Sequence, residues 1–408
     1  MKNTKRIIAA ALTGTAVLIM SCTVFASSAA YSLPESSNAV SVFANGEKIS
    51  LTDEPFVKNG EAYVPLREFL NSTSKASEIT WNDDRTLIVK NQYKNEVLDK
   101  DVSGEVYFAI DSNVIKIKDP EKNVMQKYKL QNSPLLIDSK TYIPYELIKL
   151  IDEEMRATSG IEFTVGDNAD YQEMLKKALT WADGLKTRDG KPRYEMMTED
   201  MQKEFIELQK AYVGDEEWNY VIGYSSPWTI SSDILICGDN AYITYYQTDS
   251  TPEIYVYNEK LTFEKSDDKL LVSGSEDITA ENSSVCAYIR KIDGNKVTLD
   301  LAEFIQCTDP ERIDELNLSE DSDFPNGYYI YNPDETTAEY ILTDDTLYTF
   351  IDWNREFTDK ESDMFVMTNS LDTFTKYVNT YEESKPGMPF FFELDGDEVW
   401  SITEHYMP

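Results

Sequence analysis

Apolar and polar residues alternate over short stretches along most of this chain, and the pattern predicts many short strands with few helices. The clearest stretch is Pro55–Leu70, which reads PFVKNGEAYVPLREFL. Its Asn59-Gly60 pair supplies the positive φ angles that a tight hairpin needs. Pro65 lacks a backbone N–H and suits a first helical turn. The stretch therefore predicts a strand, a turn, a strand, and a helix with an apolar face at Leu66, Phe69 and Leu70.

A second copy of this stretch follows at Pro134–Ile148, PLLIDSKTYIPYELI. In both copies a Tyr comes eight residues after the first Pro and the second Pro two residues later, an offset of 79 residues. The second copy has Asp138-Ser139 at its turn, without the Gly, and Pro144-Tyr145-Glu146 where the first has Pro-Leu-Arg. The chain therefore contains an internal repeat.

The segments VFANGEKISL, PFVKNGEAYVPLREF and ITWNDDRTLIV resemble the stalk domain, also called the copper amine oxidase N-terminal-like domain. The resemblance covers about residues 40–165 and implies a non-catalytic module of secreted and envelope proteins of Gram-positive bacteria. It does not imply oxidase activity. A copper amine oxidase needs several histidines on its metal, and this chain has one, His405.

The middle of the chain has two helical patterns followed by four strand patterns. Helices are expected at Tyr171–Leu185 and from Thr198, which suits a cap; strands are expected at 228–236, 241–247, 254–263 and 270–272. Two helices followed by an antiparallel meander are similar to the cone-shaped folds of cystatins and nuclear transport factors. The run KTRDGKPRYEMM…NYVIGYSSPW also resembles an extracytoplasmic segment of beta-lactam-sensor-like membrane peptidases, without their peptidase motif.

The last third is rich in strand patterns and predicts a small, partly open β-barrel. Hairpins are expected around Asp293-Gly294-Asn295 and Asp395-Gly396-Asp397. Further strands are expected at 327–331, 338–342 and 347–351, and helices at 309–316 and 371–381. The fold class is therefore α+β with several domains.

The first residues have the pattern of a secretory signal peptide. Lys2, Lys5 and Arg6 precede an apolar run of 14 residues, and Val24-Phe25-Ala26 offers small residues for cleavage after Ala26. An uncleaved anchor or a lipid-modified Cys22 are the alternatives. We expect no membrane span after cleavage, because no other run of about 18 apolar residues exists. The expected division is signal peptide 1–26, linker 27–39, stalk domain 40–166, cone-like domain 168–279 and C-terminal β-rich domain 281–408.

The composition restricts the partners. Without Lys2, Lys5 and Arg6 the chain carries 35 Lys/Arg against 74 Asp/Glu, a net charge of −39. Such a charge disfavours nucleic acid and anionic lipid. The same charge could attract cationic partners, or it could be a solvated acidic surface. Three cysteines outside the leader, Cys237, Cys286 and Cys307, do not make a disulfide framework, although a Cys286–Cys307 bridge is one option.

Catalytic and metal motifs are missing from the sequence. It contains no HExxH, CxxC, GxGxxG, GxxxxGK[ST] or GxSxG pattern, and Asp321-Ser-Asp323 falls short of a calcium loop. We therefore expect no cofactor, no metal site and no catalytic residue. His405 is expected to be a structural residue.

Aromatic residues are the remaining functional signal. We predict that Trp181, Tyr194, Trp218 and Trp228, with Tyr220, gather where the helices of the middle domain lead into its sheet. Such rings could line a ligand-binding concavity, with Trp181 and Trp228 at its mouth, or could be ordinary core. Tyr328, Tyr329 and Tyr331 alternate in the last domain, so some should face solvent and suit a glycan or protein.

Three functional hypotheses follow. The first is a secreted, non-catalytic envelope protein whose stalk acts as a spacer or docking unit for two domains that bind an envelope protein or a cell-wall glycan. The second is an extracellular hydrolase of wall glycans or peptides that uses carboxylates alone; a cleft with two carboxylates about 5–10 Å apart and a raised pKa would favour it. The third is a sensor or regulatory ectodomain that works beside a membrane peptidase.

Overall fold

The structure is a computed structural model. It describes residues 40–404 except 74–77, 83–84, 96–99, 120–122, 156–159, 167–169, 215–217, 250–253, 280–283, 308, 335, 358–363 and 381–388. The predicted signal peptide and linker, Cys22 and His405 lie outside the described residues. The described residues form two compact units, the first made of those within 40–115 and 129–281, the second of those within 116–128 and 282–404.

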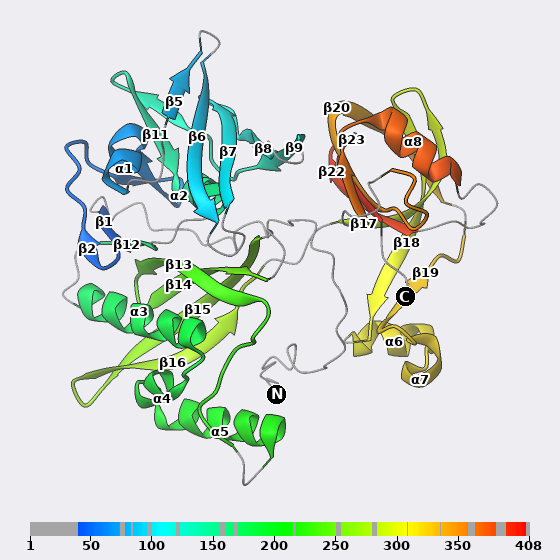
Figure 1. The fold of residues 1–408 in the computed structure, drawn as a ribbon. Helices are drawn as coiled ribbons and strands as arrows, with labels where there is room; N and C mark the ends of the chain where they lie inside the picture. Colours follow the sequence, from blue (N-terminus) through cyan, green and yellow to red (C-terminus); the bar gives the residue numbers. More distant parts are fainter. Residues whose placement is uncertain are drawn as a thin grey trace. The chain divides into compact units, whose positions relative to one another are not determined.

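The two copies of the repeat form a four-stranded sheet with a helix after each hairpin (Figure 1). The first copy contributes β3 (Phe56–Lys58), β4 (Glu61–Pro65) and α1 (Leu66–Thr73). The second contributes β10 (Leu135–Ile137), β11 (Lys140–Pro144) and α2 (Tyr145–Met155). The strand order is β10-β11-β4-β3, so the inner strands of the two hairpins pair with each other.

The repeat offset has a direct geometric meaning in this sheet. Val64 and Ile143, which are equivalent residues of the two copies, lie opposite each other in the antiparallel β4–β11 pair. Antiparallel pairing of equivalent residues places a local twofold axis between them. Both turns have two consecutive positive φ angles, 51° and 74° at Asn59-Gly60 and 49° and 64° at Asp138-Ser139. The second copy therefore makes the same turn without its glycine.

A second, five-stranded sheet lies between the two copies in sequence. Its order is β5-β6-β7-β8-β9, made of β5 (Glu78–Trp81), β6 (Thr86–Asn95), β7 (Lys100–Ala109), β8 (Val114–Asp119) and β9 (Val124–Lys129). Buried Leu87, Val89, Val106 and Phe108 alternate along β6 and β7, as expected for strands with one covered face.

The third sheet joins segments that are far apart in the chain. Its order is β16-β15-β14-β13-β12-β1-β2, made of β1 (Val40–Ala44), β2 (Glu47–Lys48), β12 (Ile161–Val165), β13 (Trp228–Cys237), β14 (Asn240–Thr248), β15 (Ile254–Ser266) and β16 (Lys269–Asp277). β12 pairs with β13 in parallel, and the four strands from β13 onward form the predicted meander. The sheet thus combines strands from the range expected for the stalk with strands from the range expected for the cone.

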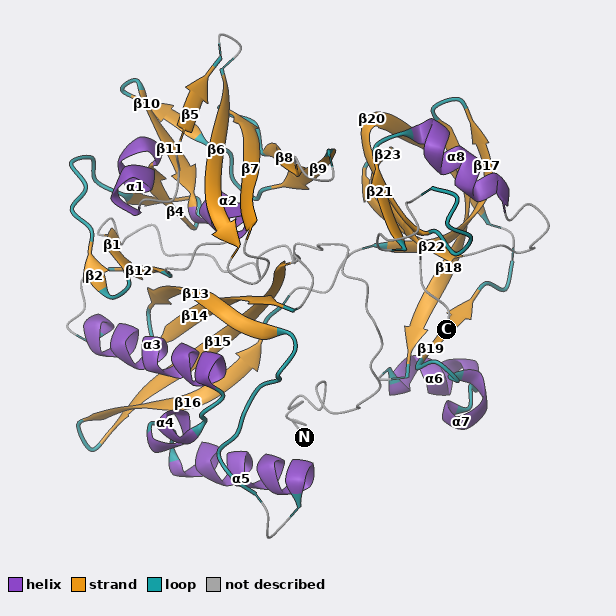
Figure 2. Ribbon diagram, in the orientation of Figure 1, coloured by secondary structure: helices purple, strands orange, loops and turns teal. Residues whose placement is uncertain are grey.

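Three helices pack on this sheet, α3 (Tyr171–Thr187), α4 (Lys191–Glu195) and α5 (Glu199–Val213) (Figure 2). The Thr198 side chain accepts a hydrogen bond from the backbone N–H of Met201 at 3.5 Å, which is the predicted cap of α5. The core beneath α3 contains Ile234 and Ile236 of β13 and buries Met174, Leu175, Ala178, Trp181 and Ala182.

The second unit contains a closed β-barrel. Its elements are β17 (Val285–Asp293), β18 (Lys296–Gln306), α6 (Pro310–Leu316), α7 (Glu320–Asp323), β19 (Tyr328–Tyr331), β20 (Thr337–Ile351), β21 (Phe365–Thr368), α8 (Leu371–Thr380), β22 (Pro389–Asp395) and β23 (Glu398–Glu404). The ring runs β18-β17-β22-β23-β20, and an additional β18–β20 pairing closes it. The barrel is therefore closed rather than partly open as predicted, and the α+β fold class is confirmed.

The barrel strands follow the order of a Greek-key barrel of the OB type, with α8 between the third and fourth barrel strands. The two strands predicted at 338–342 and 347–351 are one strand, β20. Its register against β23 shifts between Leu342 and Leu347, so the intervening residues form a bulge. α8 places Phe374 and Tyr377 in the barrel core, where they stack on Tyr348 and Phe350 at 4.5 and 4.0 Å.

Candidate functional site

The four aromatic residues predicted as a binding site do not share one environment. Trp181 of α3 is only 2% exposed and belongs to the core of the third sheet. Tyr194, Trp218 and Trp228 are half-buried. The Trp181 ring, expected at the mouth of a concavity, therefore has no face available to a ligand in this structure.

Trp181 is instead part of a buried polar network. Its Nε1–H donates to both carboxylate oxygens of Glu259, each at 3.1 Å. The Arg193 guanidinium lies 4.8 Å from the Trp181 ring centre and donates to the Trp181 carbonyl oxygen at 2.7 Å. Tyr245 and Ser275 hydroxyls also donate to Glu259, at 2.6 and 2.7 Å. Since buried charge is tolerated when it is fully hydrogen-bonded, this network reads as the polar centre of the core.

Tyr194 and Trp218 do lie in one aromatic cluster, with Phe205 and Tyr220. Tyr194 and Trp218 both contact Tyr220, with ring centres 5.4 and 5.5 Å apart, and Tyr194 contacts Phe205 at 5.7 Å. Large apolar side chains are exposed at three positions of the same helix and loop region, namely Leu208, Val221 and Tyr224. A ligand-binding role for Tyr194, Trp218 and Trp228 stays a prediction.

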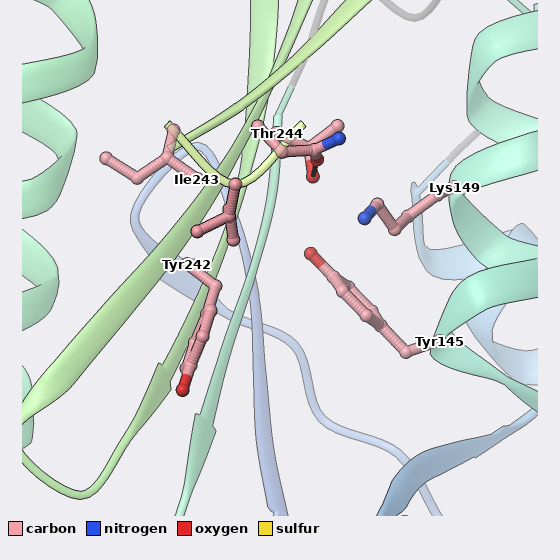
Figure 3. A pocket seen from close by; sticks show the side chains of 7 residues that line it. Tyr145, Lys149, Tyr242, Ile243 and Thr244 are labelled. Atoms are coloured by element: carbon pink, nitrogen blue, oxygen red, sulfur yellow. Dashed lines mark hydrogen bonds between the residues drawn. The ribbon is translucent and has the colours of Figure 1, made fainter. Parts of the chain in front are cut away.

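A small cavity lies where α2 meets β14 and β15 (Figure 3). It is lined by Tyr145, Lys149, Tyr242, Ile243, Thr244, Asn258 and Ile278, and its volume of about 10 Å³ gives room for one water molecule. The Tyr145 hydroxyl and the Lys149 ammonium point toward Thr244 across the cavity. The buried Thr244 hydroxyl donates to the Asn258 amide oxygen at 2.8 Å.

Little in the local sequence singles out these cavity residues. They come from four segments that only the tertiary fold brings together. The one local signal is Asn258, an uncharged polar residue inside the strand run IYVYNEKLTF. A polar side chain at an inward strand position needs a partner, and Thr244 on the adjacent strand supplies it.

A buried carboxylate accompanies the start of α2. Glu61 of β4 is 4% exposed and accepts hydrogen bonds from the backbone of Tyr145 and Glu146, the first residues of α2. Burial, with a smaller effect from the neighbouring Glu146 carboxylate, raises the pKa of Glu61 to about 8, against the lowering effect of Lys149. The Oε1 atom of Glu61 has no hydrogen-bond partner. Glu61 therefore carries a proton over part of the neutral range.

Metal binding finds no support in the residues that the structure describes. No group of three or more His, Cys, Asp or Glu side chains there could hold an ion. Cys237, Cys286 and Cys307 are free thiols, so the Cys286–Cys307 bridge does not form. No helix in the described ranges is long and apolar enough to cross a membrane.

The three tyrosines of the last domain are all half-buried on β19. Tyr328 stacks on Phe304 with ring centres 4.9 Å apart, and the Arg312 guanidinium lies 5.7 Å from the Tyr331 ring centre. Tyr329 contacts Phe324 at 6.2 Å. Each ring thus packs against a neighbour and keeps only part of its surface in solvent.

Comparison with known proteins identifies one region of the chain. No protein of curated function matches it. Residues 43–158 match the model of the copper amine oxidase N-terminal domain. This range includes both copies of the repeat and the five-stranded sheet between them. The resemblance expected from the sequence is therefore confirmed, and residues 43–158 carry a stalk domain of the copper amine oxidase N-terminal type.

Proposed function

We propose that this protein is a secreted, non-catalytic cell-envelope protein of a Gram-positive bacterium. In this proposal the stalk domain is a spacer or docking unit, and the cone-like region and the barrel bind partners. The match of residues 43–158 to the stalk domain carries the proposal, because that module is non-catalytic. The leader pattern at residues 1–26 supports export.

The carboxylate-dependent hydrolase is less well supported. Such an enzyme needs two acids on either side of a space that admits a sugar or peptide. Glu61 and Glu146 are neighbouring buried carboxylates, and one of them has a raised pKa. However, the cavity beside α2 gives room for one water molecule only, and neither Glu61 nor Glu146 lines it. Glu61 also binds backbone groups of α2, which gives it a structural task.

Export and activity can be tested separately. The full chain with its leader would be expressed in a Gram-positive host, and the culture medium and cell wall analysed by mass spectrometry. We expect a product that begins at Ser27. Retention in the cytoplasm, or a diacylglyceryl-modified Cys22, would contradict free secretion.

The purified product would then be incubated with isolated cell wall. We expect no release of soluble sugar or peptide, and we expect the protein to sediment with the wall or with an envelope protein after mild cross-linking. Release of wall fragments that disappears in a Glu61→Gln, Glu146→Gln double variant would favour the hydrolase.

A further inference from the structure

The barrel strand β20 contains a bulge at residues 343–346. Residues 343–346 of β20 have no register partners on β23, because strand pairing passes from Leu342 with Val399 to Leu347 with Ser401. The bulge is nevertheless fixed, since the buried Thr346 hydroxyl donates to the Val399 carbonyl oxygen at 2.8 Å and accepts from the Thr343 N–H at 2.9 Å. A rigid bulge is a common way to aim side chains at a binding partner.

A segment of the same compact unit lies against this bulge. Residues 116–128, which include β9 up to Tyr128, group with the barrel although they precede it by more than 150 residues in sequence. The Asn369 side chain binds Met125 of β9 twice, accepting from its N–H at 2.7 Å and donating to its carbonyl oxygen at 2.9 Å. The Asn369 amide thus makes the two hydrogen bonds that one residue of a neighbouring antiparallel strand would make with Met125. Such bonds require an extended backbone and no particular side chain.

Asn369 itself is held in place by the bulge. Its amide nitrogen also donates to the carbonyl oxygens of Asp345 and Thr346, at 3.3 and 3.1 Å. The orientation of the side chain is therefore set before a strand binds. Preorganisation of this kind lowers the entropy cost of binding.

Two residues beyond Met125, a lysine enters an acidic recess. The Lys127 ammonium forms an ion pair with Glu398 and donates to the Thr343 hydroxyl at 3.3 Å, with Asp345 3.9 Å away. The Lys127 side chain is only 10% exposed. Lys116 of β8 forms a second ion pair with Asp345 at 2.6 Å, but it is 42% exposed. Lys127 is thus the buried anchor and Lys116 the peripheral contact.

We propose that Asn369, the 343–346 bulge and Glu398 form a clamp for an extended, lysine-bearing peptide strand, with β9 as its built-in occupant. The Asn369 amide binds the backbone of one peptide residue. Thr343 and Glu398 bind the side chain of a lysine two residues C-terminal to it. A partner of this class would be a cationic extended peptide that takes the place of β9. This inference rests on the proposed binding role of the barrel and gives that role a ligand class. It follows from the contacts and not from the barrel topology, which alone does not specify a ligand.

The test uses the full chain and a synthetic, fluorescein-labelled peptide with the sequence of residues 123–129, NVMQKYK. A Met125→Pro, Lys127→Glu variant removes two contacts of β9. The proline lacks the N–H that donates to Asn369, and the glutamate replaces the cation that pairs with Glu398. We expect this variant to bind the peptide at least tenfold more tightly than the wild type by fluorescence anisotropy. A peptide with Glu in place of its first lysine should not bind, and adding Asn369→Ala should abolish binding. Equal affinity of the wild type and the variant, or of the two peptides, would overturn the proposal.

Two controls keep the result interpretable. Lys376→Ala breaks an exposed helical ion pair with Asp372 in the same unit and should leave peptide binding unchanged. If the double variant does not fold, trypsin cleavage after Lys127 in otherwise wild-type chain provides a second measurement. Cleavage there should be roughly tenfold faster in Asn369→Ala than in the wild type; equal rates would show that the clamp does not hold the strand. Neither measurement depends on export, so failure here leaves secretion and the stalk role intact.

Discussion

The two copies of the repeat share a backbone and differ in chemistry at one equivalent position. Glu61 in the first copy corresponds to Lys140 in the second, 79 residues later. Glu61 is buried at the start of α2 beside Glu146 and has a raised pKa. The Lys140 side chain is 50% exposed and forms an ion pair with Asp53, and this hydrogen bond raises the pKa of Lys140.

The comparison shows that two copies of one backbone can keep the same geometry while equivalent side chains differ in burial. The start of α2 packs against the third sheet, and Glu61 of β4, which lies beside it, is buried. The equivalent Lys140 of β11 is half exposed beside Asp53. The backbone N–H groups of Tyr145 and Glu146 hydrogen-bond to the Glu61 carboxyl and lower its pKa, but burial outweighs them. Burial disfavours the charged form of Glu61, and the raised pKa is the result.

The largest expected effect lies on the local twofold axis. Ile143→Ala should destabilise the unit that contains the repeat by about 2–5 kcal/mol, because Ile143 is fully buried and its removal leaves a cavity. Val64→Ala should cost less, by roughly the 0.8 kcal/mol of one CH₂ group. Urea unfolding of the full chain measures both. A neutral change at either position would mean that the two copies do not share one core.

The second effect is a pH dependence. Because Glu61 has a pKa of about 8 in the folded state against its ordinary value of 4.5, the folded state retains a proton that the unfolded state has lost across this interval. Stability should therefore fall as the pH rises from about 4.5 to 8. Glu61→Gln should remove this slope and stabilise the protein by up to about 4–5 kcal/mol at pH 8.5, with little change at pH 4. A melting temperature that depends on pH equally in both proteins would contradict the assignment.

The two turns differ by a single glycine and should respond in opposite directions. Gly60 has a φ of 74°, so Gly60→Val should destabilise the repeat by about 1–3 kcal/mol. Ser139 has a φ of 64° without being glycine, so Ser139→Gly should stabilise it by about 0.5–1 kcal/mol. Thermal unfolding of the two single variants makes the comparison; the same sign for both would reject the shared turn type.

The smallest expected effect is at Lys140, the exposed residue equivalent to Glu61. Lys140→Ala should leave the unfolding midpoint unchanged within error in 0.15 M salt, because solvent and ions screen an exposed ion pair. The same measurement at pH 5 and pH 8.5 separates it from Glu61→Gln, which should respond to pH. A loss of stability comparable to that of Gly60→Val would mean that the Lys140–Asp53 ion pair is not screened as an exposed pair should be.

Local sequence signals accounted for most elements of the fold. The Asn-Gly turn, the Thr198 cap and the hairpins around Gly294 and Gly396 all depend on neighbouring residues, and each was found where expected. Helix boundaries were also close: α3 was expected at 171–185 and spans Tyr171–Thr187.

Non-local pairing was the part that the sequence could not predict. Nothing in Val40–Ala44 indicates that its partner is β12, or that β12 pairs in parallel with β13. The closure of the barrel depends in the same way on β18 meeting β20. Strand partners are chosen by the packing of whole layers, which a local pattern does not encode.

The candidate site shows both outcomes. Trp181 falls three residues after Ala178 on the apolar face of α3, so its burial could have been expected from helical spacing alone. The cavity residue Lys149 is about 100 residues away in sequence from Thr244 and Asn258, and their proximity required the tertiary structure. The lysine clamp was hidden for the same reason, since Lys127 and Glu398 are 271 residues apart.

The seven-stranded sheet also constrains the order in which the chain can fold during synthesis. β1 is made first among its strands, yet its neighbour β12 is completed only at Val165, and β12 gains its parallel partner only when Cys237 has been added. Until then the nascent chain contains a repeat that can already pair with itself, while β12 has an open edge where β13 will pair. A ribosome paused before Cys237 should therefore hold a folded repeat attached to an unfinished sheet, and this interval is when the growing chain most needs protection from aggregation.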